Sequence, residues 1–475
     1  MKAGFKILIS FSVLAAVTFI KTHAQSNIDI NRWDPGATKS ANENSPVLLK
    51  NGMVFNSDKE RGSYYKRKGL NDTPIADLYY SELKEDGNWG TPKLFSEALT
   101  TEDNDGPISF NFNEDLAVFA RNIELSGFGN KRGGSSKIGL FFTTKDSTGW
   151  SNITPFQYND PGYNLKHPCL GPMGDILYFA SDKTGGFGGF DLYVSKLENG
   201  RWTEPVNLGP VVNSSAEEVF PSLHATGRLY FSSNGHDNSR DFDIFYTENF
   251  KGRWFPPVKL TSRINSGLNE YTYYVNEDFS SGYFTSNRRG TVDIFTFQST
   301  IPQFEYCKMQ QEDNYCYAFY EENTVSLDTT LYAYEWNLGD GTRIMKTEAE
   351  HCYGGPGDYL VELNVVDRLT GIVEFNQAEY LVEVRKIIQP YIVSPDTMEL
   401  NQQVQMDGTN SYLGAAKAGE FYWDFGDGEK FQGARVQHLY RTPGEYTLKL
   451  GIIEDSEDPE TAREFCSYKI VVVQE

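Results

Sequence analysis

Residues 176–202 read ILYFASDKTGGFGGFDLYVSKLENGRW, and this pattern recurs between residues 26 and 300. A short apolar strand reaches Phe179, a glycine-rich turn follows, a second strand begins at Asp191, and a polar turn leads to Trp202. Aromatic and β-branched residues in short runs between Gly, Asn and Asp turns are typical of β-strands. Counterparts of Phe179 stand at Phe55, Phe119, Phe231 and Phe284, and counterparts of Trp202 at Trp89, Trp150 and Trp254.

The repeat predicts a β-propeller. Trp150, Trp202 and Trp254 are spaced by 52 residues, and a unit of this length with four short strands is the size of one blade. The last unit stops after Phe297 without its tryptophan strand, and Arg32-Trp33 supplies a matching piece near the N-terminus. We therefore predict an all-β fold with a five-bladed ring over residues 26–300, closed by its own N-terminal strand. A six-bladed ring with one degenerate blade is the alternative.

Two segments resemble a known repeat family. Residues 172–193 and 221–245 resemble the TolB-type, WD40-like β-propeller repeat. The first two repeats are looser, because Gly139 stands where the others carry Asp and both contain longer insertions. The resemblance implies the fold and says little about function, since propellers host unrelated chemistries.

A second repeat occupies residues 303–475. Residues 336–341 read WNLGDG and residues 423–428 read WDFGDG, each followed by a His-x-Tyr and then a Gly-x-Tyr motif. This order resembles the PKD module, which implies two tandem immunoglobulin-like β-sandwiches, over residues 303–386 and 390–475. The tryptophans are predicted to fill the cores, the Asp of Gly-Asp-Gly to accept backbone N–H bonds, and the short link to stack the sandwiches end to end.

The N-terminus has the features of a signal peptide over residues 1–24. Lys2 and Lys6 precede an apolar run from Ile7 to Ile20, and small residues stand before Gln25. An uncleaved membrane anchor is the alternative. Export would place the five cysteines in an oxidising compartment. We predict one disulfide among Cys307, Cys316 and Cys352, with Cys169 and Cys466 as isolated packed thiols.

The charge and motifs limit the function. A net charge of −22 disfavours nucleic acid and anionic lipid as partners. No metalloprotease or nucleophile-elbow motif surrounds His167, His224 or His236, so we predict no enzyme activity and no metal site. No cofactor is predicted, and Ca²⁺ is an option that no motif supports.

Two sets of residues on the propeller are candidate binding positions. Glu43, Glu218 and Glu270, with Asn104 near the equivalent place, precede the innermost strands. They predict either a carboxylate ring for a cation or basic peptide, or hydrogen-bond acceptors that hold neighbouring blades together, which we favour. The second set lies in loops of local basic character: Arg121, Lys131, Arg132, Arg288 and Arg289. These loops predict either a binding site for an acidic partner or solvated loops without a binding role.

The resemblance implies a non-catalytic envelope protein. TolB-type repeats combined with PKD modules are similar to Bacteroidota proteins associated with type IX secretion and gliding. This implies a protein-interaction scaffold, a subunit of an outer-membrane-associated complex, located in the periplasm, at the outer membrane or on the cell surface. A carbohydrate-binding or glycan-processing protein and a cell-surface adhesin are the alternatives.

Overall fold

The computed structural model describes residues 28–35, 41–59, 75–101, 103–123, 137–237, 240–320, 328, 330–456 and 461–475. The protein is all-β, and these ranges contain no α-helix. Accordingly, a helical membrane crossing is absent from the described ranges. The predicted signal peptide (1–24), the inserted segments 61–73 and 124–136, and with them Lys131 and Arg132, lie outside the described residues.

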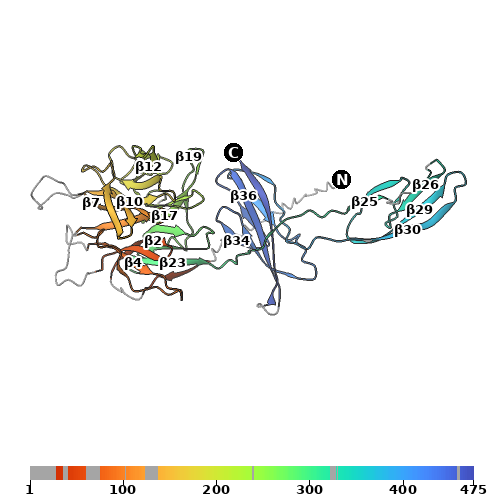
Figure 1. Ribbon diagram of the computed structural model, residues 1–475, viewed down its shortest axis with the longest axis horizontal. Coiled ribbons are helices and arrows are strands. Elements are labelled where there is room, and N and C mark those ends of the chain that lie inside the picture. The colour runs from red at the N-terminus through yellow and green to blue at the C-terminus, as the bar shows by residue number, and fades with distance from the viewer. Residues whose placement is uncertain are drawn as a thin grey trace, which may run out of the picture.

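Five antiparallel sheets make up residues 28–299, and they form a propeller at one end of the molecule (Figure 1). Their inner strands contact one another in cyclic order around a common axis: β2 (Glu43–Leu49), β6 (Asp105–Phe110), β10 (Leu165–Leu170), β15 (Glu218–Leu223) and β21 (Glu270–Val275). Between residues 28 and 299, the described part of the chain holds no sixth sheet of this kind.

Each blade continues outward through a second and a third strand to an outer strand. The second and third strands are β3 (Gly52–Ser57) and β4 (Asp77–Glu82), β7 (Leu116–Asn122) and β8 (Ile138–Asp146), β11 (Ile176–Ser181) and β12 (Asp191–Glu198), β16 (Leu229–Ser233) and β17 (Asp243–Thr247), β22 (Ser281–Ser286) and β23 (Asp293–Ser299). The outer strands are β5 (Lys93–Leu94), β9 (Gly149–Pro155), β13 (Arg201–Trp202) with β14 (Val206–Asn207), β20 (Val258–Lys259) and β1 (Ile28–Arg32); a hairpin of β18 (Asn249–Phe250) and β19 (Arg253–Trp254) precedes β20.

The recurring phenylalanine of the repeat packs between the blades. Phe55, Phe119, Phe179, Phe231 and Phe284 are all buried, with at most 1% of each side chain exposed. Each lies beside an aromatic ring of the third strand of its own blade, at ring distances between 5.5 and 6.2 Å. This pairing explains why the sequence repeats an aromatic residue in both strands.

The N-terminal strand completes the last blade. β1 pairs antiparallel with β23, with Ile28 opposite Ser299 and Arg32 opposite Phe295. Trp33 then lies buried against Phe55 and Trp89 of the first blade, at ring distances of 5.0 and 5.4 Å. The chain's first described strand therefore joins its last blade to its first.

The C-terminal region forms two β-sandwiches. In the second sandwich, the main sheet has the order β24-β37-β36-β33-β34, β31 also pairs with β37, and the opposing sheet is β32-β35. These strands are β24 (Lys308–Met309), β31 (Thr397–Glu399), β32 (Val404–Asp407), β33 (Ala418–Asp424), β34 (Lys430–Gln432), β35 (Arg435–His438), β36 (Gly444–Glu454) and β37 (Glu464–Gln474).

The first sandwich has the same plan in a shorter form. Its main sheet has the order β27-β26-β29-β30 and its opposing sheet is β25-β28. These strands are β25 (Cys316–Tyr320), β26 (Tyr332–Asn337), β27 (Arg343–Ile344), β28 (Glu348–Cys352), β29 (Gly357–Asp367) and β30 (Val373–Val384). Trp336 and Trp423 are fully buried at the centres of the two cores, as the motif predicts.

The motif residues of each sandwich form one hydrogen-bonded unit. The Asp of Gly-Asp-Gly contacts the His of His-x-Tyr, with 2.7 Å between His351 Nε2 and Asp340 Oδ2 and 2.8 Å in the second copy. The tyrosine of the same motif, Tyr353 or Tyr440, donates its hydroxyl to a carbonyl two residues after the core tryptophan, at 3.1 Å in both copies. The motif is therefore structural. The contact between its histidine and its aspartate was not predicted from the sequence.

The order of the domains in space differs from their order in the sequence. The second sandwich lies beside the propeller and the first sandwich projects beyond it (Figure 1). The chain leaves the propeller, adds β24 to the sheet of the second sandwich, forms the first sandwich, and returns along the same path. In the neck between the sandwiches, Gln311 and Gln389 exchange hydrogen bonds, and Ile387 N–H bonds to Asp313 at 2.8 Å.

Two disulfides accompany this path. Cys316 is joined to Cys352 within the first sandwich, which is a pair from the predicted set. Cys307 is joined to Cys466, so the prediction that Cys466 is an isolated thiol is wrong. The sequence does not reveal this pair because β24 precedes the first sandwich yet belongs to the second. Cys169 is free and buried.

A buried arginine connects the second sandwich to the propeller. Arg228 is 6% exposed, forms an ion pair with Glu248 at 2.7 Å and lies over the Tyr246 ring at 4.1 Å. Its guanidinium also donates to the main-chain carbonyl of Asp427, in the Gly-Asp-Gly turn, and Thr442 donates to Glu248 from the other side. The contact therefore fixes the turn of the second sandwich on the propeller.

We expect Arg228→Met to separate the two domains. The change leaves Glu248 without its ion pair, which costs about 3–5 kcal/mol for a buried pair. Small-angle scattering should show a larger radius of gyration, and thermal unfolding should split into separate transitions. Arg253→Met is the matched control, because Arg253 is 72% exposed and its ion pair to Glu475 spans 3.6 Å. An unchanged scattering profile for Arg228→Met would contradict this account of the contact.

Peptide mapping without reductant should recover Cys307 joined to Cys466 and Cys316 joined to Cys352. Cys169 should react with an alkylating reagent only after unfolding, because it is buried. Replacing both Cys307 and Cys466 with serine should destabilise the second sandwich by about 2–5 kcal/mol, since a closed loop of the chain is released. A Cys307–Cys316 crosslink in the native protein would show that the path of the chain is different.

Candidate functional site

A pocket of about 500 Å³ opens along the propeller axis. It is lined by the C-terminal parts of the inner strands and the turns that follow them: residues 45–50, 107–112, 167–170, 220–225 and 272–275. The turns at residues 224–228 and 276–280 adjoin the second sandwich through Arg228 and Phe279, and Gly428 of the sandwich lies against both. The pocket therefore opens on the face of the propeller at which the sandwich is attached.

Bulges in the inner strands shape the inner end of this pocket. Ser45, Gly106, His167 and Phe220 each precede a proline and have positive φ angles, from 52° to 101°, and the strand register shifts at each of them. Such bulges redirect side chains that would otherwise alternate regularly. The result is a stack of rings: His167 lies on Phe220 at 3.6 Å, and Tyr271 meets Phe220 edge-on at 5.7 Å.

One part of the pocket's outer rim is apolar and exposed, and the charged residues Lys50, Glu114 and Glu277 also line the pocket. Phe112 is 68% exposed and Met173 83% exposed, and they lie in neighbouring turns that are joined by a bond from Phe112 N–H to the Pro172 carbonyl. Lys50 lies 5.8 Å from the Phe112 ring, and its main-chain N–H bonds to Glu114. We call Phe112, Pro172 and Met173 the apolar rim.

The predicted carboxylates lie at the other end of the inner strands. Glu43, Glu218 and Glu270 are each at most 3% exposed. Glu218 accepts bonds from Ser214 N–H at 2.7 Å, Ser214 Oγ at 2.6 Å and Ser233 Oγ at 2.7 Å. These partners belong to the loop that enters the blade and to the blade's second strand. The geometry is that of a structural acceptor.

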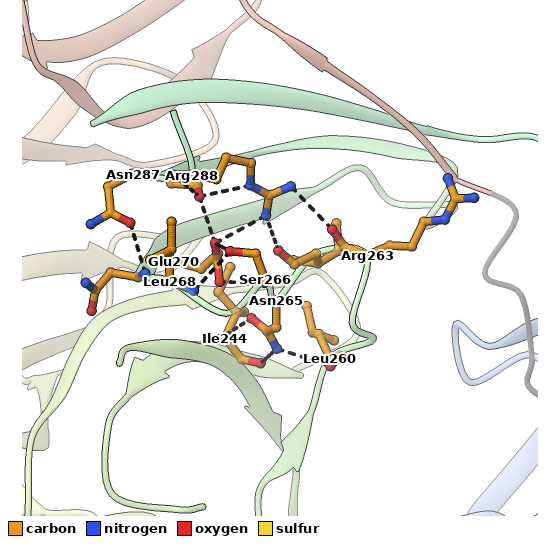
Figure 2. A network of polar contacts seen from close by, with 12 residues as sticks. Ile244, Leu260, Arg263, Asn265, Ser266, Leu268, Glu270, Asn287 and Arg288 are labelled. Atoms are coloured by element: carbon orange, nitrogen blue, oxygen red, sulfur yellow. Dashed lines mark hydrogen bonds and ion pairs between the residues drawn. The ribbon is translucent and has the colours of Figure 1, made fainter. Parts of the chain in front are cut away.

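Glu270 occupies the same arrangement in the next blade. Ser266 and Ser286 donate to its carboxylate, and Arg288 lies 3.2 Å away while also donating to the carbonyl of Ile264 (Figure 2). In the same network Asn265 exchanges two bonds with the main chain of Ile244 in the preceding blade. The loop that leads into β21 is thus joined to the blade before it.

Asn104 does not hold the equivalent position. Asp105 does, because it pairs with Arg121 in the strand register as Glu218 pairs with Ser233. Burial raises the pKa of Asp105, and the Arg121 guanidinium, 2.7 Å away, opposes that shift. Asn104 instead accepts the N–H of Ala76 in the preceding blade, at 2.9 Å. Its counterparts bond in the same way: Asn42 to Val292, Asn164 to Ile138 and Asn269 to Phe242.

The basic candidates do not form one surface among the described residues. Arg121 and Arg288 are engaged with the buried carboxylates Asp105 and Glu270 and with main-chain carbonyls. Arg289 is exposed. Lys131 and Arg132 lie outside the described residues. Binding of an acidic partner by these loops therefore stays a prediction, and it rests on Arg289, Lys131 and Arg132.

Titratable groups around the axial pocket make contacts within the protein. His167 Nδ1 lies 3.4 Å from the Phe220 N–H, and His224 contacts Thr226 and the Asn276 carbonyl. His236 lies at the opposite end of the inner strands, beside Glu218, and contacts the Val212 carbonyl at 2.7 Å. In the part of the chain that the structure describes, no group of three or more His, Cys, Asp or Glu side chains is arranged to hold a metal ion.

The fold and the pocket define an all-β protein that joins a propeller to two immunoglobulin-like sandwiches. The family model for the PKD domain matches residues 304–377 and 388–466, so both sandwiches are PKD domains. Human polycystin-1 is 27% identical over 127 residues, 25% of this chain and 3% of polycystin-1. Collagenase ColA of Clostridium perfringens is 33% identical over 94 residues, 20% of this chain and 8% of the collagenase. The chain therefore spans a small fraction of these relatives.

Solved structures also align with most of the chain. A chain from a structural study of two prolyl endopeptidases aligns with 91% of this chain and 61% of its own length, at 9% identity and a TM-score of 0.28.

The propeller should lose stability as the pH falls below about 6.5, because of His167. Burial holds the pKa of His167 well below its ordinary value of 6.5, and the charge of Lys166 acts in the same direction. The unfolded chain therefore binds a proton that the folded chain does not, which costs about 1.4 kcal/mol per pH unit below 6.5.

Urea unfolding at pH 7.5, 6.5 and 5.5 tests this expectation. His167→Asn removes the titrating ring, and asparagine tolerates the positive φ of this position. The variant should be less stable at every pH, yet lose less stability between pH 7.5 and 5.5 than the unmodified protein. Equal losses would show that His167 is not held neutral.

Proposed function

We propose that this protein is a non-catalytic, exported interaction protein whose propeller presents the axial pocket and its apolar rim to a protein partner. The observation that carries the proposal is the exposure of Phe112 and Met173 beside an apolar pocket. Aromatic residues and methionine are enriched at protein interfaces, and exposed apolar groups beside a concave pocket are typical of binding sites.

The second PKD domain supports this role through its position. It is attached by Arg228, Glu248 and Thr442 at the turns that border the pocket. The contact gives the pocket face a fixed direction relative to the rest of the molecule. The apolar rim lies in the turns between the first and second strands of the second and third blades. Its residues, Phe112, Pro172 and Met173, are exposed.

The chemistry of the pocket favours binding over catalysis. Cys169 lines it, but burial raises the pKa of this thiol to about 12, so it is protonated at neutral pH and a poor nucleophile. Burial also lowers the pKa of His224, whose ring nitrogens face Thr226 and a main-chain carbonyl. A histidine that acts as the base for a nucleophile needs a ring nitrogen that can reach that nucleophile.

The finer assignment follows the resemblance of the repeats and the leader sequence. We propose a subunit of an outer-membrane-associated complex of the TolB-repeat and PKD kind found in Bacteroidota envelopes, without a cofactor. PKD domains also occur in polycystin-1 and in collagenase ColA. Two disulfides fit an oxidising compartment.

Affinity capture from crosslinked envelopes tests the proposal. The unmodified protein should recover a defined set of envelope proteins, and Phe112→Asp with Met173→Asp should reduce that recovery at least about tenfold, because charges at an apolar contact are desolvated on binding. Val206→Asp is the matched control, since Val206 is 61% exposed on an outer strand.

The outcomes separate the candidate functions. Recovery of no protein by the unmodified chain, together with binding to a glycan array, would replace the scaffold role with carbohydrate binding. Equal recovery by the rim variant and the unmodified protein would leave an interaction role but exclude this face of the propeller. Turnover of an ester or peptide substrate that is lost with the rim variant would contradict the non-catalytic assignment.

A further inference from the structure

The last strand of the second PKD domain has both of its edges paired. One edge of β37 pairs with β36, and the other pairs in parallel with β24 and β31. Along this second edge, Gln310 N–H bonds to the Tyr468 carbonyl and Val472 N–H bonds to the Asp396 carbonyl, both at 2.8 Å. The Cys307–Cys466 disulfide holds β24 in place. A segment from outside the domain, β24, thus covers one part of this edge, and the domain's own β31 covers another part.

β30 is the equivalent strand of the first PKD domain. Leu363 stands opposite Ala378 in the first domain as Leu450 stands opposite Ser467 in the second, so the two registers correspond from Ala378 to Val384. The sheet order ends at β30, and in the described residues no strand pairs with its outer edge. The same edge is therefore covered in one copy of the domain and open in the other.

The register identifies the main-chain groups on the open edge. Tyr468 and Val472 use their main-chain groups toward β24 and β31, and their counterparts in β30 are Glu379 and Glu383. Because main-chain direction alternates along a strand, Leu381 between them faces the same way. These three residues offer the N–H and C=O groups that an added strand would use.

The side chains around this edge are unusually apolar for a free strand. Leu381 is 63% exposed, Phe375 62% and Tyr380 41%, although natural proteins usually protect open edges with lysine, proline or a short length. β30 has twelve residues. Its bulge at Asn376, where φ is 52°, interrupts the strand near one end and leaves residues 377–384 as a regular edge.

The charge of the domain indicates what would bind. Residues 303–386 contain sixteen Asp and Glu against six Lys and Arg, and three of the acidic residues, Glu374, Glu379 and Glu383, lie on β30 itself. In the second domain the covering strand that comes from outside the domain is Lys308-Met309, one basic and one apolar residue. A second copy of β30 would bring two acidic strands together, which is unfavourable.

We propose that the open edge of β30 binds an extended segment of a partner protein in which lysine or arginine alternates with apolar residues. The segment adds to the sheet as β24 adds to β37, with main-chain bonds to Glu379, Leu381 and Glu383. Its apolar side chains extend the core face beside Tyr380, whose ring lies 6.5 Å from that of Trp336. Its basic side chains lie on the outer face, beside Leu381, and pair with the two glutamates. The inference rests on the proposed interaction role but concerns a second surface, far from the propeller pocket.

The test uses the full chain and a capped octapeptide of alternating lysine and valine, with alternating glutamate and valine as the opposite probe. Fluorescence anisotropy in 0.15 M salt should show binding of the lysine peptide at least about tenfold tighter than of the glutamate peptide. Hydrogen exchange should show new protection in residues 377–384.

A matched pair of variants separates the edge from the general acidity of the domain. Glu379→Lys with Glu383→Lys should weaken binding of the lysine peptide by about tenfold or more. Glu348→Lys with Glu350→Lys makes the same charge change on exposed residues of β28, in the opposing sheet, and should change binding less than about twofold.

Several results would overturn the inference. Equal loss in both variants would mean that the peptide binds only through net charge. Protection outside β30 would place the peptide elsewhere, and a dimer by light scattering with β30 already protected would make a second copy the occupant. If the peptide fails to bind while the apolar rim still governs envelope capture, this inference falls and the proposed function stands.

Discussion

The pairing of β1 with β23 is the interaction on which the propeller depends. A four-stranded blade cannot stand alone, because one apolar face and one strand edge remain uncovered. Hydrogen bonds between Ile28 and Ser299, and onward to Arg32 and Phe295, complete the last blade with the first described strand. Trp33 then packs into the first blade. The ring is closed by residues more than two hundred positions apart, so the axial pocket, formed by all five inner strands, exists only when the ends meet.

The same demand for covered edges orders the other domains. The second PKD domain is completed by β24, which precedes the first PKD domain in the chain, and the Cys307–Cys466 disulfide secures that strand. The chain must therefore pass the second domain before it forms the first. This explains why the first domain projects at the far end of the molecule, joined by a neck in which the outgoing and returning segments hydrogen-bond to each other (Figure 1).

The sequence predicts those parts of the fold that a local pattern controls. The recurring phenylalanine and tryptophan positions reveal the blades, and Trp336 and Trp423 reveal the two PKD cores. The candidate site was less predictable. The sequence comparison places Asn104 near the position that Asp105 holds, because residues 103–105 read DND and a threonine, Thr101, stands where Ser214 and Ser266 precede the glutamates. Asn42, Asn164 and Asn269 each hydrogen-bond to the preceding blade. Their recurrence in the sequence is a signal that could have identified this contact. The Cys307–Cys466 pair and the apolar rim depend on long-range pairing and on turns meeting in space, which a linear pattern does not encode.

Buried carboxylates and the open edge of β30 show opposite uses of acidic residues. At Glu218 and Glu270, serine and main-chain donors satisfy the carboxylate, so burial costs little and the charge serves the ring. At Glu379 and Glu383 the charges are exposed, with Arg385 3.5 Å from Glu383, beside exposed Leu381 and main-chain groups that no strand of the described residues pairs with. An acidic, solvated edge discourages pairing with another acidic strand while leaving a basic one free to add. The first PKD domain thus combines solubility when alone with selectivity for the strand that covers it, and its position at the end of the molecule leaves room for that strand to approach.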